Sequence, residues 1–315
     1  MEYRQLGRSD LKVSVVSLGC WIHGKAQWHD VKDEESIAAI RTALDCGVNF
    51  LDTAEWYGGG HSEQVVGQAL AGVPRHKVIV ATKVAPTHLK RDDVFAACER
   101  SLKHLNTDYI DLYQIHWPNE NTPIEETMGA LLELQQQGKI RVIGVSNFDD
   151  RQMAECLEYG RIESLQPPYS LFWRHVEAKT LPFCRQHDIG VIAYSPMAQG
   201  LLTGKFRRDT EFPEDDIRRS NVLFRGETYQ TALEALEAIK PIAQARGKTL
   251  GQTAVNWVLR QPGITAAIVG GRNPQQVQEN VGAADWSLTD EEVAALSKLG
   301  DKVMATLDDS PVMWR

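Results

Sequence analysis

The sequence lacks the marks of several large classes of protein. Its five cysteines are far apart and form no CxxC pair, which argues against a zinc site or a disulfide framework and predicts a reducing, cytoplasmic compartment. No apolar run approaches the ~20 residues that span a bilayer, and the polar N-terminus lacks the apolar centre of a signal peptide. No HExxH motif occurs either. We therefore expect no membrane segment and no bound metal.

The chain also lacks an excess of positive charge. Asp and Glu number 42 against 34 Lys and Arg, so the formal net charge is −8. Domains that bind nucleic acid are usually basic, so we expect no nucleic-acid partner. A content of 43% hydrophobic and 24% charged residues is ordinary for a globular protein. A local basic site for a small anionic ligand remains compatible with this balance.

Short apolar runs alternate with helical patterns along almost the whole chain. Their bulky, non-alternating composition is typical of parallel strands that are covered on both faces. Eight strands are predicted, at 15–18, 48–51, 78–81, 109–115, 140–145, 164–165, 190–193 and 266–269. Helices are predicted at 33–46, 92–104, 122–137, 149–159, 176–187, 227–246, 250–261, 274–284 and 290–299. Thr122 and Glu125 are expected to form a capping box at the start of the third helix.

The spacing of the strands predicts the fold class. The first seven strand ends are separated by about the length of a βα unit, and eight such units predict an α/β fold of the (β/α)8 TIM-barrel type. Residues 2–14 resemble a β-hairpin before the first strand, and extra helices and loops extend the C-terminal part. No linker divides the chain, so 1–315 is expected to be one domain. The charged loop at 196–226 is long enough to suggest a function.

Polar residues follow the predicted strands directly, where barrel enzymes build their active sites. Asp52, Lys83 and His116 follow the second, third and fourth strands, and Tyr57 lies five residues beyond Asp52. Each alone has an ordinary structural explanation, but their joint placement favours one catalytic site. An ammonium lowers the pKa of a nearby tyrosine, and a carboxylate holds that ammonium in place. With a histidine to orient a carbonyl, the set suits proton transfer to an oxygen that gains charge as hydride reaches carbon.

Seven motifs, in order, resemble those of the aldo-keto reductase superfamily. They are LDTAEWYG (51–58), ATK (81–83), YIDLYQIHWP (109–118), IGVSNF (143–148), QPPYSL (166–171), YSPMAQGLLTGK (194–205) and GGRNPQQVQEN (270–280). The set is most similar to the bacterial branch near the general-stress and inositol-linked reductases and the potassium-channel β-subunits. The resemblance implies a catalytic tetrad of Tyr57, Lys83, Asp52 and His116. In it, Tyr57 is the general acid in reduction and the base in oxidation.

The resemblance also implies a site for NADPH, with NADH bound more weakly. Ser146, Asn147 and Gln166 would hold the carboxamide of nicotinamide, and Tyr194 would stack on its ring. Arg272 would bind the adenosine 2′-phosphate, a task that suits a planar guanidinium. The other implied cofactor positions are Trp21, Asp52, Ser195, Pro196, Met197, Gly200, Leu201, Lys205, Gly270, Gly271, Gln276, Glu279 and Asn280.

Aromatic residues near the strand ends are expected to line the substrate pocket, although packing at the barrel rim is the alternative. They are Trp21, Trp56 and Trp117, with Phe148 and Trp173 as further candidates. Arginines in or after the long loop either cover phosphate or form a solvated surface, and the second role is favoured for Arg207, Arg208, Arg218 and Arg219. Three roles are open for the tail at 310–315: at the pocket mouth, on a neighbouring subunit, or frayed.

The sequence therefore predicts a cytoplasmic enzyme that reduces aldehydes or ketones with NADPH and takes the proton from Tyr57. Two alternatives use the same site. One is a dehydrogenase of sugars, inositols or glycosides, and the other is a redox-sensing subunit that holds NADPH and turns over slowly. The expected partners are the cofactor and a small carbonyl or alcohol substrate. The oligomeric state, monomer or small homo-oligomer, stays open.

Overall fold

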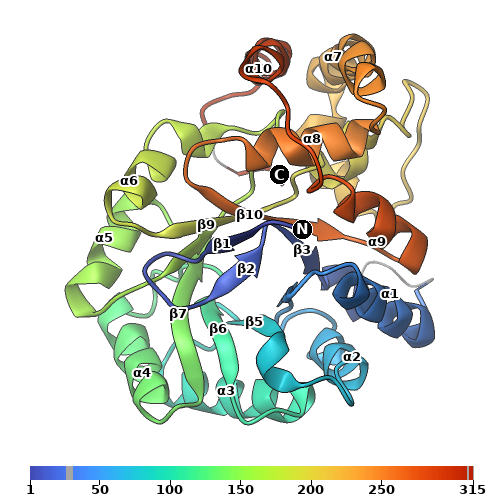
Figure 1. Ribbon diagram of the computed structural model, residues 1–315. Coiled ribbons are helices and arrows are strands. Elements are labelled where there is room, and N and C mark those ends of the chain that lie inside the picture. Colours follow the sequence, from blue (N-terminus) through green and yellow to red (C-terminus); the bar gives the residue numbers. More distant parts are fainter. Residues whose placement is uncertain (26–30, 311, 315) are drawn as a thin grey trace.

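A closed barrel of eight parallel strands forms the centre of the computed structural model, which describes residues 1–25, 31–310 and 312–314 (Figure 1). Neighbouring strands around the circle follow the chain order, and the last strand closes it against the first. The strands are β3 (Val16–Gly19), β4 (Phe50–Asp52), β5 (Ile79–Val84), β6 (Ile110–Ile115), β7 (Ile140–Ser146), β8 (Ser164–Gln166), β9 (Gly190–Tyr194) and β10 (Ile264–Gly270). The predicted (β/α)8 barrel and all eight of its strands are confirmed.

Helices surround the barrel and cover the outer faces of its strands (Figure 1). They are α1 (Asp33–Asp45), α2 (His61–Ala69), α3 (Arg91–Leu105), α4 (Ile124–Gln136), α5 (Asp150–Tyr159), α6 (Thr180–Gln186), α7 (Gly226–Ala245), α8 (Leu250–Leu259), α9 (Pro274–Val281) and α10 (Asp290–Met304). Short 3₁₀ helices η4 (Ala198–Thr203), η5 (Ile217–Ser220) and η6 (Val222–Phe224) shape the long loop after β9. Among the described helices, none combines the length and apolar composition that crossing a bilayer requires.

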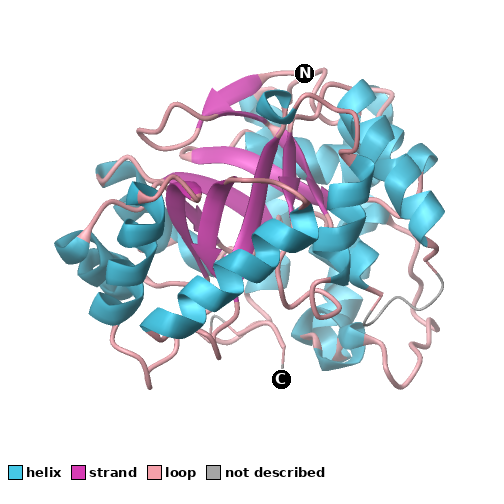
Figure 2. Ribbon diagram, turned by 90° about the horizontal axis from the view of Figure 1, so that it is seen from below, coloured by secondary structure: helices cyan, strands magenta, loops and turns pink. Residues whose placement is uncertain are grey.

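The predicted N-terminal hairpin is confirmed as β1 (Tyr3–Gln5) and β2 (Lys12–Ser14), which pair antiparallel. Its apolar side chains Leu6, Leu11 and Val13 are buried with the residues that fill the inside of the barrel. The hairpin therefore closes the end of the barrel where the strands begin. Figure 2 shows it at the opposite end of the molecule from the C-terminus. The other end of the barrel is left for a site.

The inner face of the barrel changes from apolar to polar along each strand. Successive side chains of a strand point to opposite faces, so residues two apart share a face. Phe50 of β4 is followed on the same face by Asp52, and Leu112 of β6 is followed by Gln114. Ala81 of β5 is followed in the same way by Lys83. The apolar members form the inner core, and the polar ones form a layer at the carboxyl ends of the strands.

One helix, α2, was not predicted, because glycines flank its sequence and lie within it. Gly60 precedes the helix, and Gly67 lies inside it. A Cβ at Gly67 would lie 2.7 Å from the carbonyl oxygen of His104, so this glycine permits α2 to pack closely on α3. It marks a close helix contact and does not break the helix.

Two other helix predictions need correction. The capping box at Thr122 is wrong, because α4 begins at Ile124, its N-cap is Pro123, and no side chain caps it. The single helix predicted at 176–187 is divided into η3 (His175–Glu177) and α6. Pro182 lies in the first turn of α6, where its missing N–H removes no helical hydrogen bond.

We predict that Asp111→Ala lowers the free energy of unfolding by about 3–5 kcal/mol, the usual cost of removing one partner of a buried ion pair. Asp111 is 1% exposed and accepts hydrogen bonds from Arg75 Nη2 and Arg141 Nη1, each at 2.6 Å, and from the Val80 amide at 3.0 Å. Urea unfolding measures the loss. The exposed Asp92→Ala is the control, and equal stability of the two variants would contradict the prediction.

Candidate active site

The carboxyl ends of the strands open into a cavity of about 1070 Å³. In barrel enzymes this end is where active sites lie. Most of the residues singled out from the sequence line it, from the strand ends, the long loop after β9 and the start of α9. The predicted residues among its lining are Trp21, Asp52, Trp56, Tyr57, His116, Trp117, Ser146, Asn147, Gln166, Tyr194, Ser195, Pro196, Met197, Gly200, Lys205, Gly270, Arg272, Gln276, Glu279 and Asn280.

A chain of hydrogen bonds joins Asp52, Lys83 and Tyr57 at one end of the cavity. The Lys83 ammonium is fully buried and donates to Asp52 Oδ1 at 2.7 Å, to the Thr53 carbonyl at 2.8 Å and to the Tyr57 hydroxyl at 3.2 Å. An ammonium has three donors, so all of them are used. Lys83 itself does not line the cavity, but its partners Asp52 and Tyr57 do, and its bond to Tyr57 holds the hydroxyl in place.

Burial and neighbouring charges set the protonation of this pair. Burial raises the pKa of Tyr57 above its ordinary value, and the Lys83 ammonium offsets only part of that effect. The expected lowering by Lys83 is present but does not dominate. Burial acts to lower the pKa of Lys83, yet the net direction is upward because Asp52 and Tyr57 favour the ammonium. At neutral pH the site therefore holds a protonated tyrosine beside a charged lysine.

His116 stands next to Tyr57 as a neutral imidazole. Burial, with the Lys83 ammonium as a smaller cause, places the pKa of His116 well below its ordinary value. Its ring meets Tyr57 edge-on, with centroids 5.5 Å apart, and Trp56 from another side at 5.7 Å. A neutral imidazole can donate one hydrogen bond without carrying a charge. Such a donor beside an acidic hydroxyl can orient the carbonyl of a substrate.

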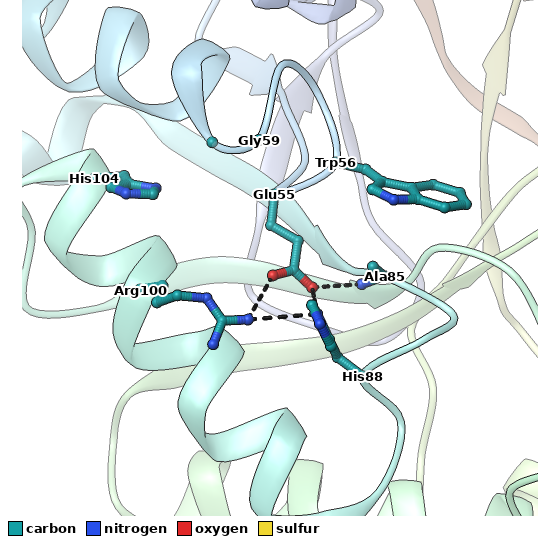
Figure 3. Close-up of a pocket in the computed structure, with 8 residues that line it drawn as sticks. Glu55, Trp56, Gly59, Ala85, His88, Arg100 and His104 are labelled. Carbon is teal, nitrogen blue, oxygen red and sulfur yellow. Dashed lines mark hydrogen bonds and ion pairs between the residues drawn. The ribbon is translucent and has the colours of Figure 1, made fainter.

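Glu55 fixes the loop that carries Tyr57 (Figure 3). Its carboxylate accepts from the Ala85 amide at 2.7 Å and from His88 Nδ1 and Arg100 Nη2, each at 3.0 Å. The backbone amide of Glu55 also donates to the Lys83 carbonyl at 3.3 Å. Because Ala85 follows β5, these bonds tie the Tyr57 loop to the strand of Lys83. The group borders a second hollow of about 410 Å³, and Trp56 lines both this hollow and the main cavity.

Gly58 lets the same loop approach its neighbour. Its φ of 64° lies in the left-handed region, and a Cβ there would lie 2.0 Å from the carbonyl oxygen of Gly24. Any larger residue would push the Tyr57 loop away from the loop after β3. Tyr57 is therefore positioned by Glu55 on one side and by a glycine contact on the other.

Amide and hydroxyl groups form a network beside the tetrad. Ser146 Oγ donates to the Gln166 carbonyl at 2.8 Å, and Asn147 Nδ2 donates to Ser146 Oγ at 3.0 Å. The Tyr194 hydroxyl donates to Asn147 Oδ1 at 2.9 Å. Gln166 Nε2 reaches Asp52 Oδ2 at 2.8 Å. These four groups are therefore mutually oriented, and Asp52 connects them to Lys83 and Tyr57.

Strained backbone accompanies this network. Asn147, Ser195, Ala198 and Gln199 have φ between 48° and 63°, a left-handed region that costs side-chain-bearing residues about 1 kcal/mol or more each. All but Ala198 line the cavity. Such strain persists where a site requires it. The turn at 195–200 thus has an unusual left-handed backbone at the cavity wall. The residue types at these positions did not predict it.

Three cations lie along another part of the cavity wall: Lys205, Arg218 and Arg272. Burial, and then the charges of Arg218 and Arg272, lower the pKa of Lys205, so the three positive charges interact. Arg218 forms an ion pair with Asp216 and is largely buried. The arginine clusters were predicted to lie on the solvated surface. This prediction agrees with Arg208, which is exposed and pairs with Glu234. It is wrong for Arg218, whose side chain is largely buried.

The start of α9 shapes the wall beside Arg272. The Arg272 amide donates to Gln276 Oε1 at 3.0 Å, and Asn280 Nδ2 donates to the Gly270 carbonyl at 3.0 Å. Asn273 caps the helix through its side chain. The predicted face of α9 thus points to the cavity, and two of its side chains hold the turn that presents Arg272.

Some predicted residues lie elsewhere. Phe148 and Trp173 are 4% and 1% exposed, pack in the core between strands and helices, and do not line the cavity. The fully buried Leu201 does not line it either, and Gly271 packs against Val277 instead. Lining residues that had not been named from the sequence include Gly19, Ile22, Gln199, Thr203, Ile217, Ile268 and Val269. Most of them carry no polar side chain, so nothing in the sequence marks them as part of a site.

The described part of the tail reaches the cavity. Trp314 lies parallel to Tyr194, with ring centroids 6.4 Å apart. The Met313 carbonyl accepts from the Val222 amide at 3.0 Å, which ties the tail to the long loop. Of the three roles left open, these residues show a position at the cavity. Pro311 and Arg315 lie outside the described residues.

The protein is thus a TIM barrel with a buried Tyr-Lys-Asp chain and a cavity with basic residues at the carboxyl ends of its strands. Residues 15–301 match the family model described as Aldo/keto reductase family. The chain belongs to this family.

Several related proteins align with nearly the whole chain. Aldo-keto reductase YhdN of Bacillus subtilis is 38% identical, over 93% of this chain and 91% of that protein. The NADH-specific methylglyoxal reductase of Escherichia coli is 35% identical, over 94% and 97%. A probable voltage-gated potassium channel subunit beta of Arabidopsis thaliana is 34% identical, over 90% and 92%. The branch expected from the motifs is confirmed.

Solved structures agree with the fold. The glycerol dehydrogenase AKR11B4 from Gluconobacter oxydans superposes with a TM-score of 0.88 at 38% identity, covering 98% of this chain and 97% of that one. An aldo-keto reductase from Klebsiella pneumoniae in complex with NADPH gives a TM-score of 0.77 at 32% identity, covering 100% and 99%.

We predict that Glu55→Ala destabilises the protein by about 1–3 kcal/mol, because it leaves the buried Ala85 amide without its acceptor. The freed Tyr57 loop should also lower kcat. Thermal or urea unfolding and steady-state rates measure the two effects. Glu99→Ala, which removes an exposed ion pair with Lys139, is the control. Indistinguishable unfolding of the two variants would refute the role of Glu55.

Proposed function

We propose that the protein reduces aldehydes and ketones to alcohols with NADPH, in a reversible reaction. The hydrogen-bonded chain from Asp52 through Lys83 to the Tyr57 hydroxyl carries this proposal. It places a protonated phenol, stabilised by charge, at the wall of a cavity that has polar, basic and aromatic parts. No other described group of side chains combines these features.

The cavity suits a dinucleotide phosphate along its length. Lys205, Arg218 and Arg272 offer positive charge for phosphates, and guanidinium groups match phosphate geometry. Ser146, Asn147 and Gln166 would hold the carboxamide, with Tyr194 against the ring. Bound there, the reduced nicotinamide supplies hydride to the carbonyl carbon. A relative from E. coli is named as NADH-specific, so preference for NADPH or NADH differs among similar proteins. We propose that in this chain the preference depends on Arg272, whose guanidinium suits a 2′-phosphate.

Proton transfer falls to the groups around Tyr57. Since its pKa is raised, Tyr57 is protonated at neutral pH and can give its proton to the oxygen that gains charge. The Lys83 ammonium then stabilises the phenolate, and Asp52 keeps Lys83 in place. Neutral His116 would donate a hydrogen bond to the same oxygen and fix the carbonyl beside the hydroxyl. In alcohol oxidation the same groups work in reverse.

The substrate would enter between exposed aromatic side chains. Trp56 and Trp117 are 52% and 36% exposed, and both line the cavity together with Trp21. Their apolar faces favour small carbonyl compounds with an apolar or ring-shaped part. A single domain over 1–315, in the cytoplasm, remains part of this proposal.

Alcohol oxidation is the second candidate, favoured by the glycerol dehydrogenase among the solved relatives. Rates in the two directions at one physiological pH separate it from carbonyl reduction. A tight cofactor complex with negligible turnover would instead favour a redox-sensing subunit. This alternative is considered because a probable potassium channel subunit beta is among the relatives.

We predict that Tyr57→Phe lowers kcat for carbonyl reduction by about 10²–10⁴-fold, the usual contribution of a positioned acid. The affinity for NADPH should stay within about threefold, because the hydroxyl bonds only to Lys83 among the described residues. NADPH oxidation with nitrobenzaldehyde, methylglyoxal and isatin measures the first effect, and fluorescence titration measures the second. Retained turnover would exclude Tyr57 as the acid.

A second prediction concerns the choice of cofactor. Arg272→Ala should weaken NADPH binding by about ten- to a hundredfold, the range expected for lost hydrogen bonds to a charged phosphate. Binding of NADH, which lacks the 2′-phosphate, should change by about twofold at most. Titration of both cofactors decides the point. Equal losses for the two would mean that Arg272 does not read the 2′-phosphate.

A further inference from the structure

We infer that Gln114 is a positioning residue that fixes Gln166 as a hydrogen-bond acceptor toward the carboxamide of the cofactor. The inference rests on the proposed function, because it requires a nicotinamide beside Gln166. Gln114 was not singled out by the sequence, and it does not line the cavity. It is fully buried on β6, two residues before His116. A buried amide in that place needs partners and therefore a physical explanation.

Both partners of Gln114 belong to the site. Its Oε1 accepts from Gln166 Nε2 at 3.3 Å, and its Nε2 donates to Asp52 Oδ2 at 3.4 Å. Gln166 Nε2 also donates to Asp52 Oδ2 at the shorter distance of 2.8 Å. The three side chains come from β6, β8 and β4, so they meet across the inside of the barrel. They form a closed triangle of hydrogen bonds beneath the cavity.

The triangle uses both hydrogens of the Gln166 amide nitrogen. A side-chain amide has two N–H donors and one carbonyl oxygen. One donor goes to Asp52 and the other to Gln114, so none is left for a ligand. Among the described residues, no donor reaches Gln166 Oε1, and Gln166 lines the cavity. Gln166 can therefore accept from the NH₂ group of a carboxamide but cannot donate to its oxygen.

Gly144 makes room for this arrangement. It lies opposite Gln114 on the neighbouring strand β7, and its own Cβ would lie 3.1 Å from Gln114 Cγ and 2.2 Å from Ser164 Oγ. A side chain there would clash with Ser164 Oγ and crowd Gln114, so the glycine leaves Gln114 the space it occupies in the triangle. Without Gln114, Asp52 would keep one Gln166 hydrogen, while the second would be free to turn toward the cavity. Gln114 thus accepts the second N–H of Gln166 and leaves Gln166 no free donor.

The test compares NADPH with its 3-acetylpyridine analogue, which has a methyl group in place of the NH₂. Wild-type protein should bind NADPH more tightly, because the analogue offers Gln166 no donor. Gln114→Met, an apolar side chain of similar length, should lower the ratio of the two affinities by about three- to tenfold, the range of one net hydrogen bond. Fluorescence titration gives both dissociation constants without turnover. Gln68→Met, at an exposed position of α2, is the matched control.

A double-mutant cycle shows whether Gln114 acts through Gln166. Gln166→Met alone should lower the ratio, and adding Gln114→Met should lower it no further. Equal weakening of both cofactors by Gln114→Met, with the ratio unchanged, would reduce Gln114 to a structural residue and overturn the inference, as would a wild-type ratio near one. Gln114→Leu replaces the Met variant if the latter does not fold. If wild type does not bind NADPH at all, the proposed function fails first.

Discussion

The buried ion pair of Lys83 and Asp52 is the constraint on which the open end of the barrel depends. Removing two charges from water costs several kcal/mol for each ion, and one good contact rarely offsets it. Here every donor of Lys83 is used, by Asp52, the Thr53 carbonyl and Tyr57. Asp52 Oδ2 meanwhile accepts from Gln166 and Gln114. Strands β6 and β8 and the loop after β4 supply the partners that offset this cost, and one of these partners is the Tyr57 hydroxyl.

This constraint explains why the network proposed for catalysis overlaps with the one that stabilises the fold. The glutamines that stabilise Asp52 stand beside the place proposed for nicotinamide, and Glu55 ties the Tyr57 loop to the strand of Lys83. A change at the cofactor end of the cavity therefore reaches the Tyr57 hydroxyl through side chains that are hydrogen-bonded in series. Since each is 9% exposed or less, little rearrangement can occur without leaving a buried polar group unpaired.

Sequence patterns could predict whatever repeats or lies at a strand end. The alternation of strands and helices gave the barrel, and polar residues after apolar runs gave Asp52, Lys83 and His116. Features created by tertiary contact were not predictable in this way. Gln114 lies inside an apolar strand, where only the meeting of three strands reveals its partners. Gly67 looks like a helix breaker until its contact with α3 is known, and Arg218 looks solvated until the long loop folds over the cavity.

Charge is distributed unevenly between the two ends of the cavity. At the Tyr57 end Asp52 balances Lys83, and neutral His116 and Tyr57 add no net charge, so this end suits the uncharged carbonyl of the proposed reaction. At the other end lie Lys205, Arg218 and Arg272, with the carboxylates of Asp216 and Glu279 nearby, and the charges of Arg218 and Arg272 lower the pKa of Lys205 in addition to the effect of burial. A polyanion there would relieve that repulsion. The overall charge of −8 thus coexists with a basic cavity wall, because local geometry rather than net charge decides what the cavity attracts.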